Sequence, residues 1–288
     1  MQQSGAVCEF TNSDSWVILS PIEQSIKRKI ESVGTPLKDW DINIYRGVLT
    51  GYNEAFIIST EKREEILANC QSEDERKRTA ELIRPILRGR DIKRYGYNWA
   101  NLWLINTHNG IRGKLERIHI EDYPAVKAHL DQYWDKISKR ADKGETPYNL
   151  RNCAYLEDFS KPKMLWKRVG SILRFCYNDN ETLGLDSTCF ATGENIEFIC
   201  CVLNSPMGHY LLKDAPKTGT GDLLVSVQAI EPIQLPQVGS ETNSEFKKLL
   251  ERLIKTDTPS NEKEISCKVF KLYDLSLDEQ SYIETNFT

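Results

Sequence analysis

Hydrophobic residues recur at helical spacing in several segments of the chain. In residues 20–34, four apolar side chains fall on one face of a helix, a Ser-Pro pair stands at its start and a glycine at its end. These residue types are preferred at helix N-termini and C-termini. The same spacing predicts further helices over residues 62–70, 72–84, 124–141, 195–204, 207–212, 243–254, 262–273 and 276–283. Ser72 is expected to cap the helix over 72–84. Trp134 is expected in the apolar stripe of the helix over 124–141, and Phe246 and Leu250 in that of the helix over 243–254.

Short apolar runs that lack helical spacing predict the strands, which we expect over residues 102–105, 161–169, 172–177 and 224–235. In the strand over 161–169, Met164 and Leu165 are expected to be buried. Lys163 and Lys167 stand four residues apart, so they are expected to share one face, because strand side chains alternate.

The stretch of residues 45–58 predicts a β-hairpin with a polar tip. Gly47 and Gly51 permit a tight turn, because glycine adopts positive φ angles and close backbone approaches. Thr50 and Asn53 surround the second glycine, and Asn53 carries both a hydrogen-bond donor and an acceptor. An ordinary hairpin and a hairpin whose tip faces a partner both fit this pattern.

The mixture of helices and strands predicts an α+β (mixed α/β) fold, with a twisted, mainly antiparallel sheet and packed helices. We expect a linker or disordered segment at residues 1–15, a main domain at residues 16–236 and a C-terminal helical segment at residues 237–288.

Composition excludes several classes of protein. A chain of 288 residues with 40% hydrophobic and 28% charged residues can bury a substantial core. No apolar run approaches the roughly 20 residues of a membrane helix, and the N-terminus lacks the features of a signal peptide. Eight cysteines without a Cys-x-x-Cys pair and four histidines without zinc spacing predict reduced thiols and no metal site. We therefore expect a cytoplasmic protein with no membrane partner.

Charge is segregated along the chain, although the net charge of −4 by itself argues against a nucleic-acid partner. Residues 76–94 hold eight basic residues against two acids, and residues 161–174 hold five basic residues and no acid. The tail from Asp257 holds seven acids against three lysines. Segregation of this kind suits an anion-binding face. The alternative is a set of solvated helix faces, which we favour for residues 76–78.

The common catalytic motifs are absent from the sequence. There is no Gly-x-Ser-x-Gly elbow, no Asn-Pro-Pro-aromatic tetrapeptide and no convincing glycine-rich strand-to-helix turn. Lys217-Thr-Gly-Thr-Gly221 lacks the spacing of a phosphate-binding loop. These absences favour a binding module without catalytic residues of its own.

Several motifs follow one another in an order that carries a family resemblance. They are Gly47-Val-Leu-Thr-Gly-Tyr-Asn-Glu-Ala-Phe56, Ile83-Arg-Pro-Ile-Leu-Arg-Gly-Arg-Asp-Ile-Lys-Arg-Tyr95, Lys139-Arg-Ala-Asp-Lys-Gly144, Pro147-Tyr-Asn-Leu-Arg151, Phe159-Ser-Lys-Pro-Lys163, Leu203-Asn-Ser205 and Val269-Phe-Lys-Leu-Tyr-Asp-Leu275. Over roughly residues 16–285 the chain resembles the C-terminal specificity domain of TaqI-like and Eco57I-like adenine methyltransferases and type II (IIG/IIS) restriction-modification enzymes.

The resemblance implies that residues 16–236 form a DNA target recognition domain. It implies double-stranded DNA and a methyltransferase domain or subunit as partners. It also implies that S-adenosylmethionine and Mg²⁺ serve the catalytic domains of a parent enzyme, so we expect no cofactor in this chain. Whether the chain is a fragment or a separate specificity subunit stays open, as does the presence of a nuclease in the parent.

On this interpretation the candidate DNA-binding residues are the cationic, amide and aromatic side chains of the predicted turns and of the lysine-rich strand. Each also fits a structural role: Arg88 could pair with Asp91, Tyr148 could belong to the core, and the hairpin-tip residues could hold their own turn. The candidates are Thr50, Asn53, Arg88, Arg90, Lys93, Arg94, Tyr148, Asn149, Arg151, Lys161, Lys163, Lys167 and Arg168.

Two other classes of function remain open. The chain could be an interaction scaffold or defence-system accessory that docks a methyltransferase through its acidic C-terminal helices without binding DNA. It could also be a stand-alone enzyme whose site carries no familiar motif.

Overall fold

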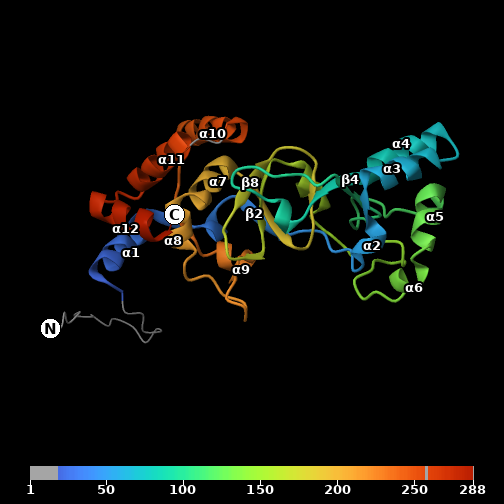
Figure 1. Cartoon of the computed structure of the whole chain (residues 1–288), viewed down its shortest axis with the longest axis horizontal. Helices are drawn as coiled ribbons and strands as arrows, with labels where there is room; N and C mark the ends of the chain where they lie inside the picture. Colours follow the sequence, from blue (N-terminus) through green and yellow to red (C-terminus); the bar gives the residue numbers. More distant parts are fainter. Residues whose placement is uncertain (1–18, 257–258, 288) are drawn as a thin grey trace.

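The computed structural model describes residues 19–256 and 259–287, so the predicted linker at residues 1–15 lies outside the described residues. The molecule is elongated, with strands at its centre and a group of helices at each end (Figure 1). Its buried apolar side chains form two clusters, which we call the first core and the second core.

A four-stranded antiparallel sheet separates the two cores. Its strands lie in the order β2 (Ile42–Arg46), β10 (Thr188–Gly193), β6 (Lys163–Lys167) and β8 (Phe175–Asn178). In β6, Met164 and Trp166 belong to the first core and Leu165 to the second, because successive side chains point to opposite faces. Burial on both faces explains why these strands are apolar in consecutive positions.

A second four-stranded sheet belongs to the second core. Its order is β3 (Ile57–Ser59), β5 (Leu102–Ile105), β4 (Ile83–Leu87) and β9 (Leu183–Gly184). The β4–β9 pair is parallel and the other two pairs are antiparallel. Two short antiparallel ladders join β1 (Gly34–Pro36) to β12 (Gln234–Pro236) and β7 (Val169–Gly170) to β11 (Leu223–Leu224).

One group of helices encloses the first core (Figure 1). At its centre α7 (Ile196–Asn204) is buried at every residue. No helix among the described residues combines the length and hydrophobicity that crossing a bilayer requires. The other helices of this group are α1 (Pro21–Val33), α8 (Pro206–Leu211), α9 (Val227–Ile230), α10 (Ser240–Lys255), α11 (Pro259–Leu272) and α12 (Leu277–Phe287).

The helices at the opposite end enclose the second core (Figure 1). They are α2 (Asn53–Phe56), α3 (Thr60–Ala68), α4 (Glu73–Leu82), α5 (Pro124–Asp131) and α6 (Trp134–Ile137). Single 3₁₀ turns lie between the larger elements. They are η1 (Leu37–Asp39), η2 (Gly89–Asp91), η3 (Ile120–Asp122) and η4 (Leu156–Ser160).

The predicted α+β class is confirmed, with antiparallel pairing in most ladders. Local signals also located several helix ends. At the start of α1 the Glu23 amide donates to Ser20 Oγ, and the Ser20 amide donates to the Glu23 carboxylate at 3.0 Å, which forms a capping box. Ser72 caps α4 as the sequence predicts.

The predicted hairpin over residues 45–58 is wrong. Strand β2 pairs with β10, β3 pairs with β5, and the two strands lie in different sheets. Ala55 and Phe56, which the predicted hairpin would place in its second strand, are fully buried in the helical turn α2. Gly51 does take a positive φ of 69°. A short apolar run fits a strand or a buried helical turn equally well, and here packing in the second core decided between them.

Two further elements differ from their predictions. The helix expected over residues 124–141 ends at Asp131 and resumes as α6, because Tyr133 leaves the helical backbone and packs its ring against Tyr52 and His129. Trp134, predicted in its apolar stripe, is 43% exposed. The strand expected over 224–235 is interrupted by α9, where Ile230 is fully buried in the first core.

Candidate nucleic-acid interface

A small basic hollow lies on the surface where β6 ends and where η2 follows β4. Its volume is about 140 Å³. None of its lining residues is acidic, and Arg90, Lys167 and Arg174 form no ion pair within the described part of the chain. We call this set the basic hollow: Gly89, Arg90, Ile92, Lys167, Ser171, Ile172 and Arg174.

Close backbone packing brings the two basic runs of the sequence together in the basic hollow. The Gly89 amide donates to Ser187 Oγ at 3.0 Å, which ties η2 to the turn before β10. A Cβ atom at Gly89 would lie 2.8 Å from Lys167 Cγ, so only glycine allows this approach. Residues 77 to 84 positions apart in the sequence thereby form one cationic surface, as the segregated charge pattern suggested.

The Arg88–Asp91 ion pair shapes the turn that displays Arg90. Arg88 Nη2 lies 2.8 Å from Asp91 Oδ1, and Arg88 Nε donates to Asp91 Oδ2 at 3.1 Å. The Arg88 backbone amide donates to the same carboxylate at 2.8 Å. Hydrogen bonding to Asp91 raises the pKa of Arg88. Arg88 therefore has the structural partner that the sequence offered as its alternative, whereas Arg90 is exposed.

Arg94 is bound by two of the helices around the first core, α7 and α11. Its Nη1 lies 3.0 Å from Glu262 Oε1 of α11, and its Nη2 donates to the Asn204 carbonyl at 2.7 Å. The residue thus links the β-rich centre to the helices around the first core. Lys93 beside it is half-buried and forms no ion pair among the described residues.

Arg140 was not a candidate residue, yet it binds the loops that carry several of the candidates. It is 7% exposed, and its guanidinium donates to the backbone carbonyls of Thr50, Asp142, Pro147 and Asn149. Burial lowers the pKa of Arg140 to about 10. Thr50 and Asn149 are 2% and 1% exposed, so both side chains are buried among the loops that Arg140 joins.

The remaining candidates of this region also have internal partners. The Thr50 hydroxyl donates to Asn53 Oδ1 at 2.5 Å, just where α2 begins. Tyr148 donates its hydroxyl to Asp131 at 2.6 Å, and burial raises the pKa of Tyr148. Arg151 Nη1 lies 2.7 Å from Asp142 Oδ1.

The lysines of the strand region differ sharply in burial. Lys161 is exposed and pairs with Asp158 at 2.5 Å, which raises its pKa. Lys163 is fully buried, donates to Asn178 Oδ1 at 3.2 Å and to the Asn180 carbonyl at 2.5 Å, and has its pKa lowered to about 8 by burial. Lys167 is exposed at the other end of β6.

Of the candidate residues, Arg90 and Lys167 meet in the basic hollow, and the half-buried Arg168 follows Lys167 directly in the chain. The Arg168 Nε is buried without a hydrogen-bond partner in the described structure. Arg174 joins them and was missed as a site residue, although it closes the acid-free basic run over 161–174. Nothing in the local sequence distinguishes Ile172, which lies among these cations, from a core residue.

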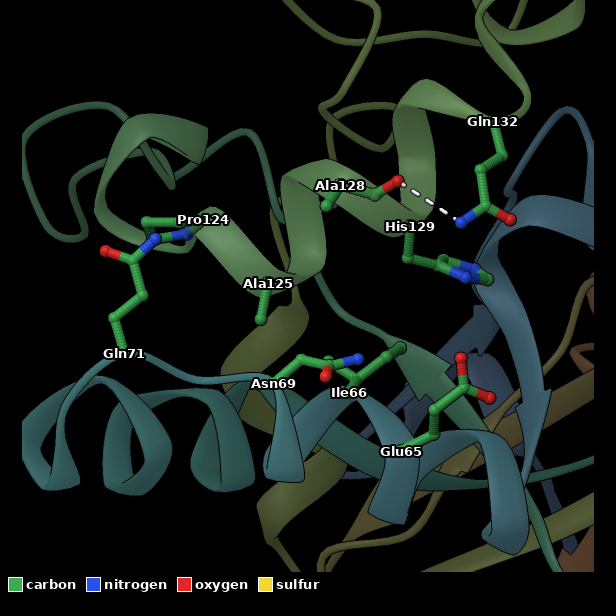
Figure 2. Close-up of a pocket in the computed structure, with 9 residues that line it drawn as sticks. All are labelled: Glu65, Ile66, Asn69, Gln71, Pro124, Ala125, Ala128, His129 and Gln132. Atoms are coloured by element: carbon green, nitrogen blue, oxygen red, sulfur yellow. Dashed lines mark hydrogen bonds between the residues drawn. The ribbon is translucent and has the colours of Figure 1, made fainter.

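A second hollow, of about 190 Å³, lies between α3 and α5 (Figure 2). His129 faces it, and its Nε2 lies 3.0 Å from the Ala55 carbonyl oxygen. Burial lowers the pKa of His129, which favours the neutral ring. No lysine, arginine or candidate residue lines this hollow, so it is separate from the basic hollow. Within the described ranges, no group of three or more histidine, cysteine or acidic side chains could hold a metal ion.

Solved structures of restriction-modification enzymes share the fold of this chain. The first, the Type IIL restriction-modification enzyme MmeI in complex with DNA, matches with a TM-score of 0.61 at 10% identity. The second, the type IIG restriction endonuclease BpuSI, matches with a TM-score of 0.52 at 14% identity. The matches cover 88% and 92% of this chain but 36% and 31% of the two enzymes, so the chain spans about a third of their length. No protein-family model and no curated protein matches the sequence.

Proposed function

We propose that this chain is a target recognition domain that binds double-stranded DNA and positions it for an adenine-specific methyltransferase domain or subunit. The observation that carries the proposal is the basic hollow, where Arg90, Lys167 and Arg174 come together without a carboxylate. The fold likeness to two restriction-modification enzymes, one of them solved with DNA, supports it.

The chemistry of the basic hollow suits a polyanion whose charges are spaced along a chain. Like charges that gather without a carboxylate repel one another, and a duplex offers one phosphate charge per roughly 1.7 Å of its axis to offset them. Lys167 is a point charge on a flexible stem, which fits a phosphate. Arg90 presents a planar fork from a turn that the Arg88–Asp91 pair holds, which fits two oxygens of one phosphate.

A salt titration of duplex binding tests this function. We expect the wild-type chain to bind a fluorescent duplex at about 50 mM salt, with log affinity falling linearly against log salt concentration. Each of R90A, K167A and R174A should lower the magnitude of that slope by about 0.9. The matched controls are K77A and K248A, which remove exposed lysines of α4 and α10 that form no ion pair among the described residues.

Two results would reject the proposal. One is the absence of wild-type binding at about 50 mM salt, where electrostatic attraction is strong. The other is a loss of slope in the control variants that equals the loss in the variants of the basic hollow. Either result would favour a scaffold that docks a partner protein without touching DNA.

A further inference from the structure

Ile172 is an exposed apolar side chain in the wall of the basic hollow. It is 60% exposed, and of the five large hydrophobic side chains exposed by the described residues it alone lines this hollow. Its neighbour Leu173 is 9% exposed and packs in the first core. The preceding strand β7 is paired with β11. The loop is therefore held on both sides of Ile172, and the exposure of this side chain is a property of the fold.

The surroundings of Ile172 restrict what could cover it. Arg90, Lys167 and Arg174 line the same hollow, so the ligand has to carry negative charge close to an apolar surface. A free phosphate would satisfy the cations and leave Ile172 in water. Duplex DNA carries both features, because phosphates flank a stack of apolar base faces. Isoleucine is also stiff at χ1, so little side-chain entropy is lost when it becomes fixed against a ligand.

We propose that Ile172 acts as a wedge against the base stack of DNA bound at the basic hollow, partly unstacking one base step and bending the duplex. The three cations hold the phosphates on either side of that step. This inference rests on the proposed function and adds a specificity mechanism to it. Unstacking is easiest at pyrimidine–purine steps, so Ile172 would favour sites that contain one at the position it reaches.

The experiment uses duplexes that the wild-type chain enriches from a random pool. One strand carries 2-aminopurine, scanned along the site, and the ends carry a pair of dyes that report bending by energy transfer. The wild-type chain should raise the 2-aminopurine fluorescence at one position and bring the duplex ends closer. The I172A variant should lose both signals and lose about tenfold in its preference for enriched over scrambled duplex. Its salt slope should equal that of the wild type, because no phosphate contact is removed.

Matched variants separate a wedge from a general surface effect. I172L keeps a large apolar side chain and should keep both DNA signals. L277A removes the side chain of a leucine that is 81% exposed on α12 and should change neither. Because Ile172 is exposed, I172A should unfold in urea at the wild-type midpoint.

The failures of the two proposals are distinguishable. Salt-dependent binding by the wild type without bending or unstacking overturns the wedge and leaves the proposed function standing. Wild-type signals in I172A also overturn the wedge. If the wild type binds no duplex at any salt concentration, both proposals fail, and an acidic protein surface becomes the better partner for the basic hollow.

Discussion

Replacement of Arg140 by methionine should destabilise the protein without changing its charged surface. The side chain is 7% exposed and lies over the Phe56 ring, with 4.4 Å between its guanidinium carbon and the ring centroid. Methionine is also long and unbranched, so it can fill most of the same space. The variant therefore removes hydrogen bonds and leaves little cavity.

The contacts of Arg140 determine the expected size of the effect. Its guanidinium donates to the carbonyls of Thr50, Asp142, Pro147 and Asn149. In R140M the Asn149 carbonyl would still accept a hydrogen bond from the Gly144 amide, at 3.0 Å. Thr50 is 2% exposed, so its carbonyl would stay unsatisfied at a cost of about 1–3 kcal/mol.

Water should partly compensate the other two carbonyls, because Asp142 and Pro147 are half-buried. Removal of a charge whose pKa burial lowers to about 10 offsets a further part of the loss. We therefore expect R140M to lose about 3 kcal/mol of the free energy of unfolding.

Equilibrium unfolding in urea measures this loss. For an m-value of about 3 kcal/mol/M, the midpoint of R140M should fall by about 1 M. R140K keeps the charge and loses the planar fork, so its urea midpoint should lie between those of R140M and the wild type. The control is R112M, since Arg112 is exposed and forms no ion pair within the described structure. If R140M and R112M share one midpoint, Arg140 does not hold these loops together.

Two further predictions concern pH dependence and close packing. Burial lowers the pKa of Lys163 to about 8 in the folded protein, against about 10.5 in the unfolded chain. Between these two pH values the unfolded chain therefore binds more protons at this amine than the folded protein does. The wild type should therefore gain stability relative to K163M as pH rises through this window, by at most about 1.4 kcal/mol per pH unit, and parallel urea midpoints across it would contradict the reasoning. The G47A variant should lose more than about 2 kcal/mol, because the added Cβ would lie 2.0 Å from the Leu185 carbonyl oxygen. The matched control G219A, where a Cβ meets nothing within 4 Å, should unfold like the wild type, and an equal thermal midpoint for both variants would refute the clash.

Local sequence determined the elements whose signals lie within one turn or one strand. The Ser20 capping box and the Ser72 cap set the starts of α1 and α4, since a cap needs only residues three positions away. The apolar stripe of α10 was readable for the same reason, and its buried residues Phe246 and Leu250 are those that the spacing predicts. The concentration of basic residues in two runs was equally visible along the chain.

Only the tertiary structure decided which of those cations face solvent without a partner. Arg88 and Arg90 stand two residues apart, yet the first is bound by Asp91 and the second is exposed. Lys163 and Lys167 lie on one strand, yet the first is buried against Asn178. Burial and pairing depend on atoms that folding brings together from distant parts of the chain. The sequence alone could therefore predict a basic surface and could not say that Arg90, Lys167 and Arg174 would form it around an exposed isoleucine.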